Sequence, residues 1–159
     1  MANALQLGSK APDFDLAADG GQRLRLSDLK GQITVLYFYP KDDTSGCTRE
    51  AIEFTEAAPE FEAAGARVVG VSKDSAASHD KFKAKHQLKV SLASDTDGEV
   101  VEAYGVWVEK SMYGRTYMGI ERATFLIDRN GAVQRVWRKV KASGHAAEVL
   151  NAVRELNQS

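Results

Sequence analysis

The sequence has few of the residues that mark several classes of protein. Of its 159 residues, one is cysteine and three are proline. A single cysteine excludes an internal disulfide and any zinc or iron–sulfur site built from several cysteines. No repeat and no tract rich in Pro, Gly or Ser interrupts the chain, which argues against a linker between domains. The lone thiol, Cys47, therefore has no partner cysteine within its own chain.

An excess of one charge and a long apolar run are also missing. The 21 Lys and Arg residues balance 22 Asp and Glu residues, which leaves no long-range attraction to nucleic acid or anionic lipid. The longest apolar run, residues 33–39, is far below the ~18 residues of a membrane-spanning helix. The N-terminus lacks the basic start and apolar stretch of a signal peptide. We therefore expect no nucleic-acid or membrane partner and a cytoplasmic location, where a lone thiol stays reduced.

What the sequence does contain is typical of a globular protein. Hydrophobic residues make up 43% and charged residues 27% of the chain, close to the averages for soluble domains. The length suits one domain on the prior of about 100–200 residues for each. We therefore expect a single domain over residues 1–159.

The hydrophobic pattern predicts an N-terminal hairpin followed by alternating strands and helices. Residues 12–26 are typical of short strands around a turn at residues 19–21. The run 33–39 predicts a buried strand, a helix begins near Cys47, and residues 67–72 predict the next strand. A strand, helix and strand within about 40 residues predict parallel strands joined by a right-handed crossover.

The rest of the chain continues this alternation. Pro59 lies inside the first helical pattern and predicts a kink or a restart. Further helices are expected near 76–87, 98–104 and 144–156, and further strands near 92–94, 106–108, 117–120, 123–128 and 133–137. A mixed central sheet with helices on both faces accounts for this order. A thioredoxin-like α/β sandwich has this order, and so do several other α/β folds.

Cys47 lies at the predicted junction between the first central strand and the helix that follows it. Ligand sites of open α/β sheets lie outside the carboxyl ends of the strands. A helix N-terminus presents unpaired N–H groups and a positive dipole end, which favour a thiolate over a thiol. The alternative is a buried cysteine that acts only as a small hydrophobe. The polar neighbours on both sides, residues 44–46 and 48–50, favour the reactive interpretation.

Three spaced segments resemble one known family. The segment 37–48, Tyr-Phe-Tyr-Pro-Lys-Asp-Asp-Thr-Ser-Gly-Cys-Thr, resembles the active-site segment of the peroxiredoxins, and more narrowly of the bacterioferritin-comigratory (Q-type) subfamily. The signature of proline, three residues, threonine, two residues and cysteine matches at Pro40, Thr44 and Cys47. Residues 117–128 resemble the segment that supplies the family's arginine, and residues 137–146 also recur in the subfamily. The resemblance covers nearly the whole chain and implies a thioredoxin-like fold.

The resemblance also implies a set of functional residues. Cys47 would attack a peroxide oxygen and become a sulfenic acid. The Thr44 hydroxyl would contact the peroxide or the thiolate, and backbone N–H groups of the first helical turn would add donors. Arg122, 75 residues beyond Cys47, would stabilise the thiolate and polarise the peroxide. Pro40 would shield the thiolate from water.

Each of these residues also has a simpler structural interpretation. Pro40 can be no more than the end of a strand, and Thr44 no more than a helix cap or a loop residue. Arg122 can be an ordinary surface arginine. Glu50, in the first helical turn, is expected to interact with the helix dipole and is not assigned a catalytic role.

The sequence departs from the subfamily in its cysteines. Many Q-type members carry a resolving cysteine five residues after the first, where this chain has Ile52, and others carry one in the next helix, near Lys83. No cysteine stands at either place, so the oxidised Cys47 has to be reduced by an external thiol such as thioredoxin, or glutaredoxin with glutathione. A cysteine removed by engineering is the other explanation for this pattern.

Two further groups of residues give weaker evidence of a functional site. His79, His86 and His145 have no compact ligand spacing, so we expect solvated helix histidines and no metal site. The apolar stretch within residues 107–118 is expected to be core or a covered loop, with the rim of a peroxide pocket or an interface as the alternative.

The sequence therefore favours a thiol-dependent peroxidase acting on hydrogen peroxide and organic hydroperoxides, without a cofactor and as a monomer. A redox sensor or thiol-binding module, whose Cys47 is oxidised without rapid turnover, is the main alternative. A scaffold with a purely structural cysteine is a third, weaker one.

Overall fold

The fold is built on a mixed β-sheet. The computed structural model describes residues 5–158, and in this range seven strands form one sheet in the order β2-β1-β5-β4-β3-β8-β9. The strands are β1 (Asp15–Ala18), β2 (Arg23–Arg25), β3 (Ile33–Phe38), β4 (Ala66–Ser72), β5 (Ser91–Ser94), β8 (Ala123–Ile127) and β9 (Val133–Trp137). β4 runs parallel to both β3 and β5. The other pairs, β1–β2, β1–β5, β3–β8 and β8–β9, are antiparallel.

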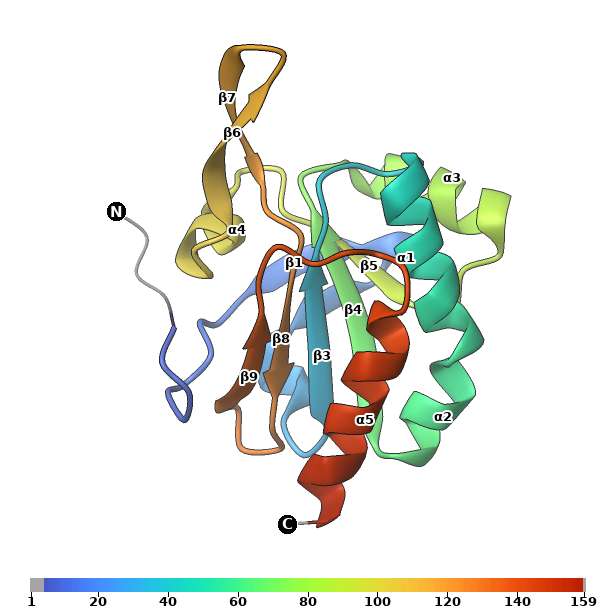
Figure 1. The fold of residues 1–159 in the computed structure, drawn as a ribbon. Helices are drawn as coiled ribbons and strands as arrows, with labels where there is room; N and C mark the ends of the chain where they lie inside the picture. The colour runs from blue at the N-terminus through green and yellow to red at the C-terminus, as the bar shows by residue number, and fades with distance from the viewer. Residues whose placement is uncertain (1–4, 159) are drawn as a thin grey trace.

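Helices cover both faces of this sheet, as the sequence predicts (Figure 1). Four helices pack on one face, over a core that includes Tyr37, Phe54, Phe61 and Phe82. They are α1 (Ser45–Glu56), α2 (Ala58–Ala63), α3 (Ala76–His86) and α5 (His145–Gln158). The short helix α4 (Glu99–Ala103) covers the other face together with the N-terminal segment and the 3-10 turn η2 (Leu26–Leu29). A second 3-10 turn, η1 (Asp19–Gly21), joins β1 to β2 and contacts α3 through Asp19 and Gly20.

The predicted crossover and its interruption are both confirmed. β3, α1, α2 and β4 form a β–α–β unit in which Ile33 pairs with Ala66 and Phe38 with Val71. α1 ends at Glu56, and α2 begins at Ala58 with Pro59 in its first turn. Pro59 interrupts the helix because it has no N–H to donate to the preceding turn.

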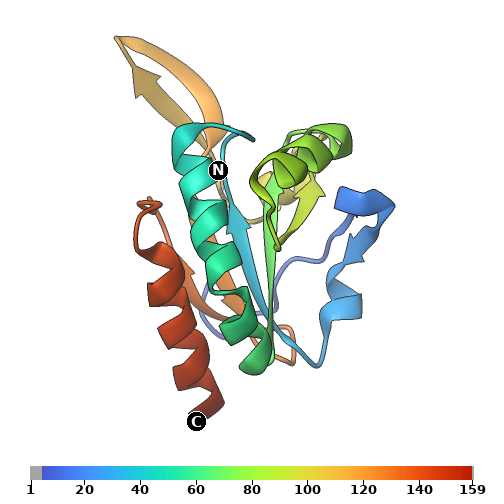
Figure 2. The same cartoon turned by 90° about the vertical axis from the view of Figure 1, so that its right-hand side faces the viewer.

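A second, two-stranded sheet departs from expectation. β6 (Trp107–Met112) and β7 (Arg115–Ile120) form a hairpin longer than the two minor strands predicted from the sequence. Figures 1 and 2 show it rising from the body at the end where α1 begins. Most of the apolar stretch is exposed, at Met112, Tyr113, Tyr117 and Met118, so the expectation of a covered loop is wrong for these residues. Trp107, at the base, packs against the core.

The expectation of solvated histidines is also wrong for two of the three. His79 and His145 are buried, because the ring nitrogens of each have protein partners. His79 contacts Asp42 and the Ala93 carbonyl, and His145 contacts Thr124 and Glu148. Burial lowers the pKa of His145.

Metal-ligand clusters and membrane-spanning helices are both missing from the described part of the chain. Within residues 5–158, no group of three or more His, Cys, Asp or Glu side chains is placed to hold a metal ion. No helix in the same range is long and apolar enough to cross a membrane.

Candidate active site

The loop after β3 places the N-terminus of α1 at the carboxyl end of the parallel strands. Tyr39 extends the pairing of β3 by donating its N–H to the Val71 carbonyl at 3.1 Å. Pro40 follows, half-buried, and ends the ladder because it lacks an N–H. Thr44 precedes α1 with extended backbone angles (φ −90°, ψ 156°), and its carbonyl accepts from the Thr48 N–H at 2.8 Å. The strand and loop therefore place the start of α1 above the sheet.

Cys47 is the third residue of α1 and lies under this loop. Only 2% of its surface is exposed, and it belongs to the core cluster that contains Tyr37, Tyr39 and Phe54. Backbone N–H groups in the first turn of a helix have no partner within the helix. The sulfur is therefore close to unpaired donors and to the positive end of the helix dipole.

Arg122 reaches the same point from a distant part of the sequence. It precedes β8, whose first residue, Ala123, pairs with Phe38 at the end of β3. Its Nη2 donates to the Cys47 Sγ at 3.2 Å, and its Nη1 donates to the Glu50 Oε1 at 2.7 Å. Only 17% of the Arg122 side chain is exposed, so it is not an ordinary surface arginine.

Gly46 leaves the room that this guanidinium occupies. A Cβ added at this position would lie 3.1 Å from the Arg122 Nη2. That distance is shorter than ordinary van der Waals contact, so a larger residue would displace the guanidinium group or the helix turn. The small residue next to Cys47 thus allows the close approach of cation and sulfur.

Glu50 is a part of the site to which the sequence analysis assigned no catalytic role. It is 1% exposed, and its Oε2 has no hydrogen-bond partner among the described residues. Burial raises its pKa to about 7, although the neighbouring Arg122 favours the ionised form. Burial disfavours the charge on Arg122 too, but Glu50 and Cys47 raise the pKa of the guanidinium. The sequence did contain a signal that Glu50 lies near Cys47. The two residues are three positions apart in one helix and therefore share a helix face.

Thr44 and Pro40 lie on the same loop without a recorded bond to the sulfur. The hydroxyl of the exposed Thr44 donates its one hydrogen to the Lys41 carbonyl at 2.8 Å. Its oxygen lone pairs are left to accept from another group. Pro40 stands four residues before Thr44 at the mouth of the loop. The structure thus brings Cys47 and Arg122 into direct contact, and it places Pro40 and Thr44 on the loop that leads into α1.

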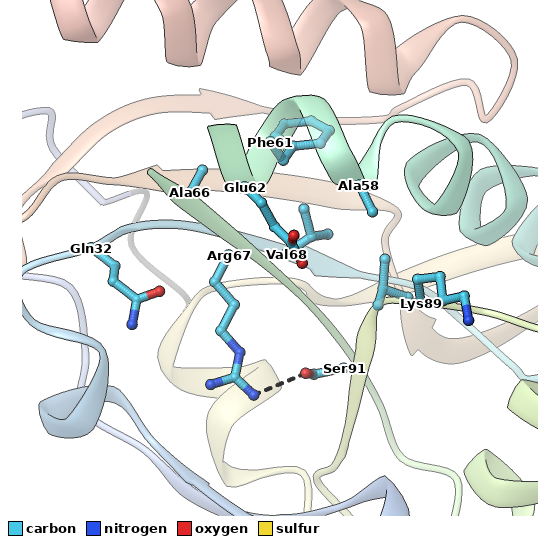
Figure 3. Close-up of a pocket in the computed structure, with 10 residues that line it drawn as sticks. Gln32, Ala58, Phe61, Glu62, Ala66, Arg67, Val68, Lys89 and Ser91 are labelled. Carbon is cyan, nitrogen blue, oxygen red and sulfur yellow. Dashed lines mark hydrogen bonds between the residues drawn. The ribbon is translucent and has the colours of Figure 1, made fainter. Parts of the chain in front are cut away.

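A well-formed cavity lies elsewhere. It has a volume of about 260 Å³ and is bordered by Gln32, Phe61, Arg67 and Ser91 among others (Figure 3). Gln32, Arg67 and Ser91 lie at the amino ends of the parallel strands and Phe61 lies in α2, whereas Cys47 lies beyond the carboxyl end of β3. The Arg67 guanidinium donates to the Ser91 Oγ at 3.0 Å, so one of its donors already has a partner within the protein. The cavity is separate from the cysteine site.

Comparison with known proteins assigns the family. The model of the AhpC/TSA family matches residues 7–136. A putative peroxiredoxin Bcp of Coxiella burnetii is 51% identical over 92% of this chain and 97% of its own length, and the peroxiredoxin Bcp of Bacillus subtilis is 46% identical over 97% and 98%. This chain is a peroxiredoxin of the Bcp type, in the AhpC/TSA family. As a peroxiredoxin it is a thiol-dependent peroxidase.

Solved structures agree with this family and its fold. The peroxiredoxin superposes on Xanthomonas campestris peroxiredoxin Q with a TM-score of 0.89 at 44% identity, covering 99% of both chains. A structure of the bacterioferritin comigratory protein of the same organism, described in terms of its alkyl peroxide reduction activity, matches with a TM-score of 0.87 at 45% identity over 91% of this chain and 92% of the other. The thioredoxin-like fold expected from the sequence is therefore confirmed.

Proposed function

We propose that this peroxiredoxin reduces hydrogen peroxide and organic hydroperoxides with Cys47 as the nucleophile. The observation that carries the proposal is the 3.2 Å contact between the Arg122 Nη2 and the Cys47 Sγ at the start of α1. A fixed cation and a helix N-terminus both stabilise a thiolate, which is the reactive form of cysteine. The alkyl peroxide reduction described for the Xanthomonas campestris relative supports the inclusion of organic hydroperoxides.

The reaction is a displacement on oxygen. The thiolate sulfur attacks one peroxide oxygen, the O–O bond breaks, and the sulfur becomes a sulfenic acid. The other oxygen leaves with the electron pair and takes a proton to become water or an alcohol. Arg122 and the free N–H groups of the first turn of α1 stabilise the developing negative charge. The Thr44 oxygen accepts a hydrogen bond from the peroxide, and Pro40 restricts the access of water.

An external thiol completes the cycle. The position five residues after Cys47 holds Ile52, and in α3 the position considered for a second cysteine holds Lys83, which pairs with Asp19 at 2.7 Å. A first thiol therefore condenses with the sulfenic acid to give a mixed disulfide and water, and a second thiol releases Cys47. We assign thioredoxin, or glutaredoxin with glutathione, as the reductant.

The remaining parts of the proposal concern the setting of the reaction. The chain acts as one domain over residues 1–159 and as a monomer. A cytoplasmic location suits a catalytic thiol that depends on the thiol reductants of a reducing compartment.

The test is steady-state peroxide consumption with a panel of thiol donors, comparing wild type with Cys47→Ser. We expect sustained turnover with at least one donor in the wild type and none in the variant. Oxidation of one equivalent followed by a stall with every donor would identify a redox sensor instead. Activity retained by Cys47→Ser would overturn the assignment of the nucleophile.

A further inference from the structure

A buried polar cluster lies under the loop that carries the active-site residues. Asp42, in the middle of this loop, is 8% exposed. Its carboxylate accepts from the Tyr39 hydroxyl at 2.6 Å and from the Ser78 hydroxyl at 2.8 Å. The same carboxylate lies 2.8 Å from the Nδ1 of His79. Two of these partners, Ser78 and His79, belong to α3, so Asp42 ties the loop to that helix.

The other side of the imidazole fixes the direction of these hydrogen bonds. The Nε2 of the fully buried His79 lies 2.9 Å from the Ala93 carbonyl in β5, which can only accept. Asp42 is buried, but hydrogen bonds from His79, Tyr39 and Ser78 hold the pKa of its carboxyl below the ordinary value. Both ring nitrogens of His79 therefore face oxygen acceptors, the Ala93 carbonyl on one side and the Asp42 carboxylate on the other. This buried pair joins the loop, α3 and β5.

The loop backbone is held as well as its side chain. The Asp42 N–H donates to the Asp74 Oδ2 at 2.8 Å, and Asp74 also accepts from the Ser72 hydroxyl at 2.7 Å. The next residue, Asp43, adopts a left-handed conformation (φ 59°) and points outward. There it pairs with Lys85 at 2.7 Å and with His86 at 2.8 Å, on the exposed side of the same contact between loop and α3.

Stability alone does not explain the burial of this pair. Taking polar and charged groups out of water is costly, and replacing a buried polar pair by apolar residues of similar size is often neutral or stabilising. The best-supported benefit of such a pair is the selection of one arrangement among several. Here the selected arrangement is that of residues 40–44, which lead directly into Cys47.

We propose that Asp42 and His79 form a positioning pair for the peroxidase reaction. The pair fixes the loop against α3, and this holds the first turn of α1 where the Cys47 sulfur meets Arg122. Neither partner touches the sulfur, so the pair acts through the loop. The inference rests on the proposed function of Cys47.

Two substitutions of His79 separate this contact from general packing. In His79→Asn the amide takes the place of Nδ1 and can still donate to Asp42, but it cannot reach the Ala93 carbonyl. In His79→Gln the amide takes the place of Nε2 and keeps the contact with Ala93 but loses Asp42. Both variants lack the imidazole ring, so loss of ring packing is common to them. Asp42→Asn removes the charge from the other side of the pair.

The measurement is the second-order rate constant of reduced protein with hydrogen peroxide, alongside the thermal midpoint. We expect Asp42→Asn and His79→Gln to react about tenfold more slowly or worse, because displacing a reacting group by ~1 Å can cost up to about a hundredfold. His79→Asn should recover most of the rate. Asp43→Asn, which removes the outward ion pair and suits a left-handed backbone, should stay within about twofold of wild type on the argument that exposed pairs contribute little.

Three results would overturn the proposal. The first is a rate within twofold of wild type in His79→Gln. The second is equal impairment of His79→Asn and His79→Gln, which would show that the bond to Asp42 is not the important one. The third is impairment of Asp43→Asn as severe as that of Asp42→Asn. The proposed function fails separately, through peroxidase activity retained in Cys47→Ser.

Discussion

At the residue scale, the site buries three polar groups that would each be costly to bury alone and that form hydrogen bonds with one another. The Cys47 sulfur, the Arg122 guanidinium and the Glu50 carboxyl are all largely withdrawn from water. Arg122 bridges the other two with separate nitrogens, at 3.2 Å to the sulfur and 2.7 Å to the carboxylate. A planar guanidinium suits this bridge because it presents several donors in fixed directions.

The first prediction concerns that bridge. We expect Arg122→Lys to lower the rate constant with peroxide by ~10²-fold or more, the loss typical for one donor aimed at developing charge. A lysine ammonium cannot serve both partners with the geometry of the guanidinium. Stopped-flow oxidation of the reduced protein measures the effect.

Arg138→Lys is the matched control for this prediction. Arg138 pairs with Glu121, the residue next to Arg122, at 2.7 Å, and it also donates to the Gly105 carbonyl at 2.9 Å. The control should react at nearly the wild-type rate. Equal rates for Arg122→Lys and Arg138→Lys would remove Arg122 from the mechanism.

The second prediction follows from the raised pKa of Glu50. Its carboxyl ionises near pH 4.5 in the unfolded chain but at about 7 in the folded protein. Between these values the folded state holds a proton that the unfolded state has lost, so stability falls as the pH rises through this window and then levels off. Glu50→Gln cannot ionise, so its free energy of unfolding should lack this decline.

Urea unfolding at several pH values from 4.5 to 7 measures the difference. Glu155→Gln, at an exposed position near the C-terminus, serves as control and should follow the wild type. Parallel curves for wild type and Glu50→Gln would contradict the raised pKa.

At the scale of elements, strand ends and a helix start decide where the chemistry lies. β3 ends at Phe38, two residues before Pro40, and α1 begins after Thr44. The register of β3 with β8 brings Arg122 close to this junction. α1 is unbroken from Ser45 to Glu56, with Cys47 on its buried side and Ile52 partly exposed. The geometry of this helix limits which partners can reach the sulfur.

The third prediction tests that limit with Ile52→Cys. Five residues of α-helix rise about 7.5 Å, which exceeds the ~7 Å between Cα atoms that a disulfide can span. Peroxide should therefore produce a disulfide in this variant only together with unwinding of the first turns of α1. Far-ultraviolet circular dichroism and intact mass, recorded on the same oxidised sample, should show loss of helix and loss of both thiols together. A disulfide formed with full helix content would contradict the expectation.

At the scale of the whole molecule, the chain has one thiol with which to run a two-electron reaction. The fold supplies a nucleophile and a cation, and the sequence holds no second cysteine to form a disulfide with the oxidised one. The hairpin β6–β7 carries exposed apolar side chains but adds no thiol.

The fourth prediction is a stoichiometry. Without a thiol donor, the protein should consume about one equivalent of peroxide rapidly, because each chain holds one cysteine. Intact mass should then show a sulfenic acid, and added thiol should convert it to a mixed disulfide. Repeated turnover in the absence of thiol would contradict the single-cysteine cycle.

Much of the fold could be predicted because its signals are local. The alternation of apolar residues placed β3, β4, α3 and α5 within a few residues of their bounds. The hairpin β6–β7 was underestimated because its outer half is exposed and carries no periodic buried pattern. The prediction of a solvated His79 is wrong because the burial of an imidazole depends on partners at distant positions, here Asp42 and Ala93.

Three features follow from the order of the residues alone: the lone cysteine at a helix start, the family resemblance and the dependence on an external thiol. They depend on residue identity and short-range spacing, which the sequence contains directly. Three others appear only in the folded chain: the contact of Arg122 with Cys47, the burial of Glu50 and the pairing of Asp42 with His79. Each of the three depends on the packing of the folded chain, through strand register, desolvation and contact between a loop and a helix, which spacing along the sequence does not contain.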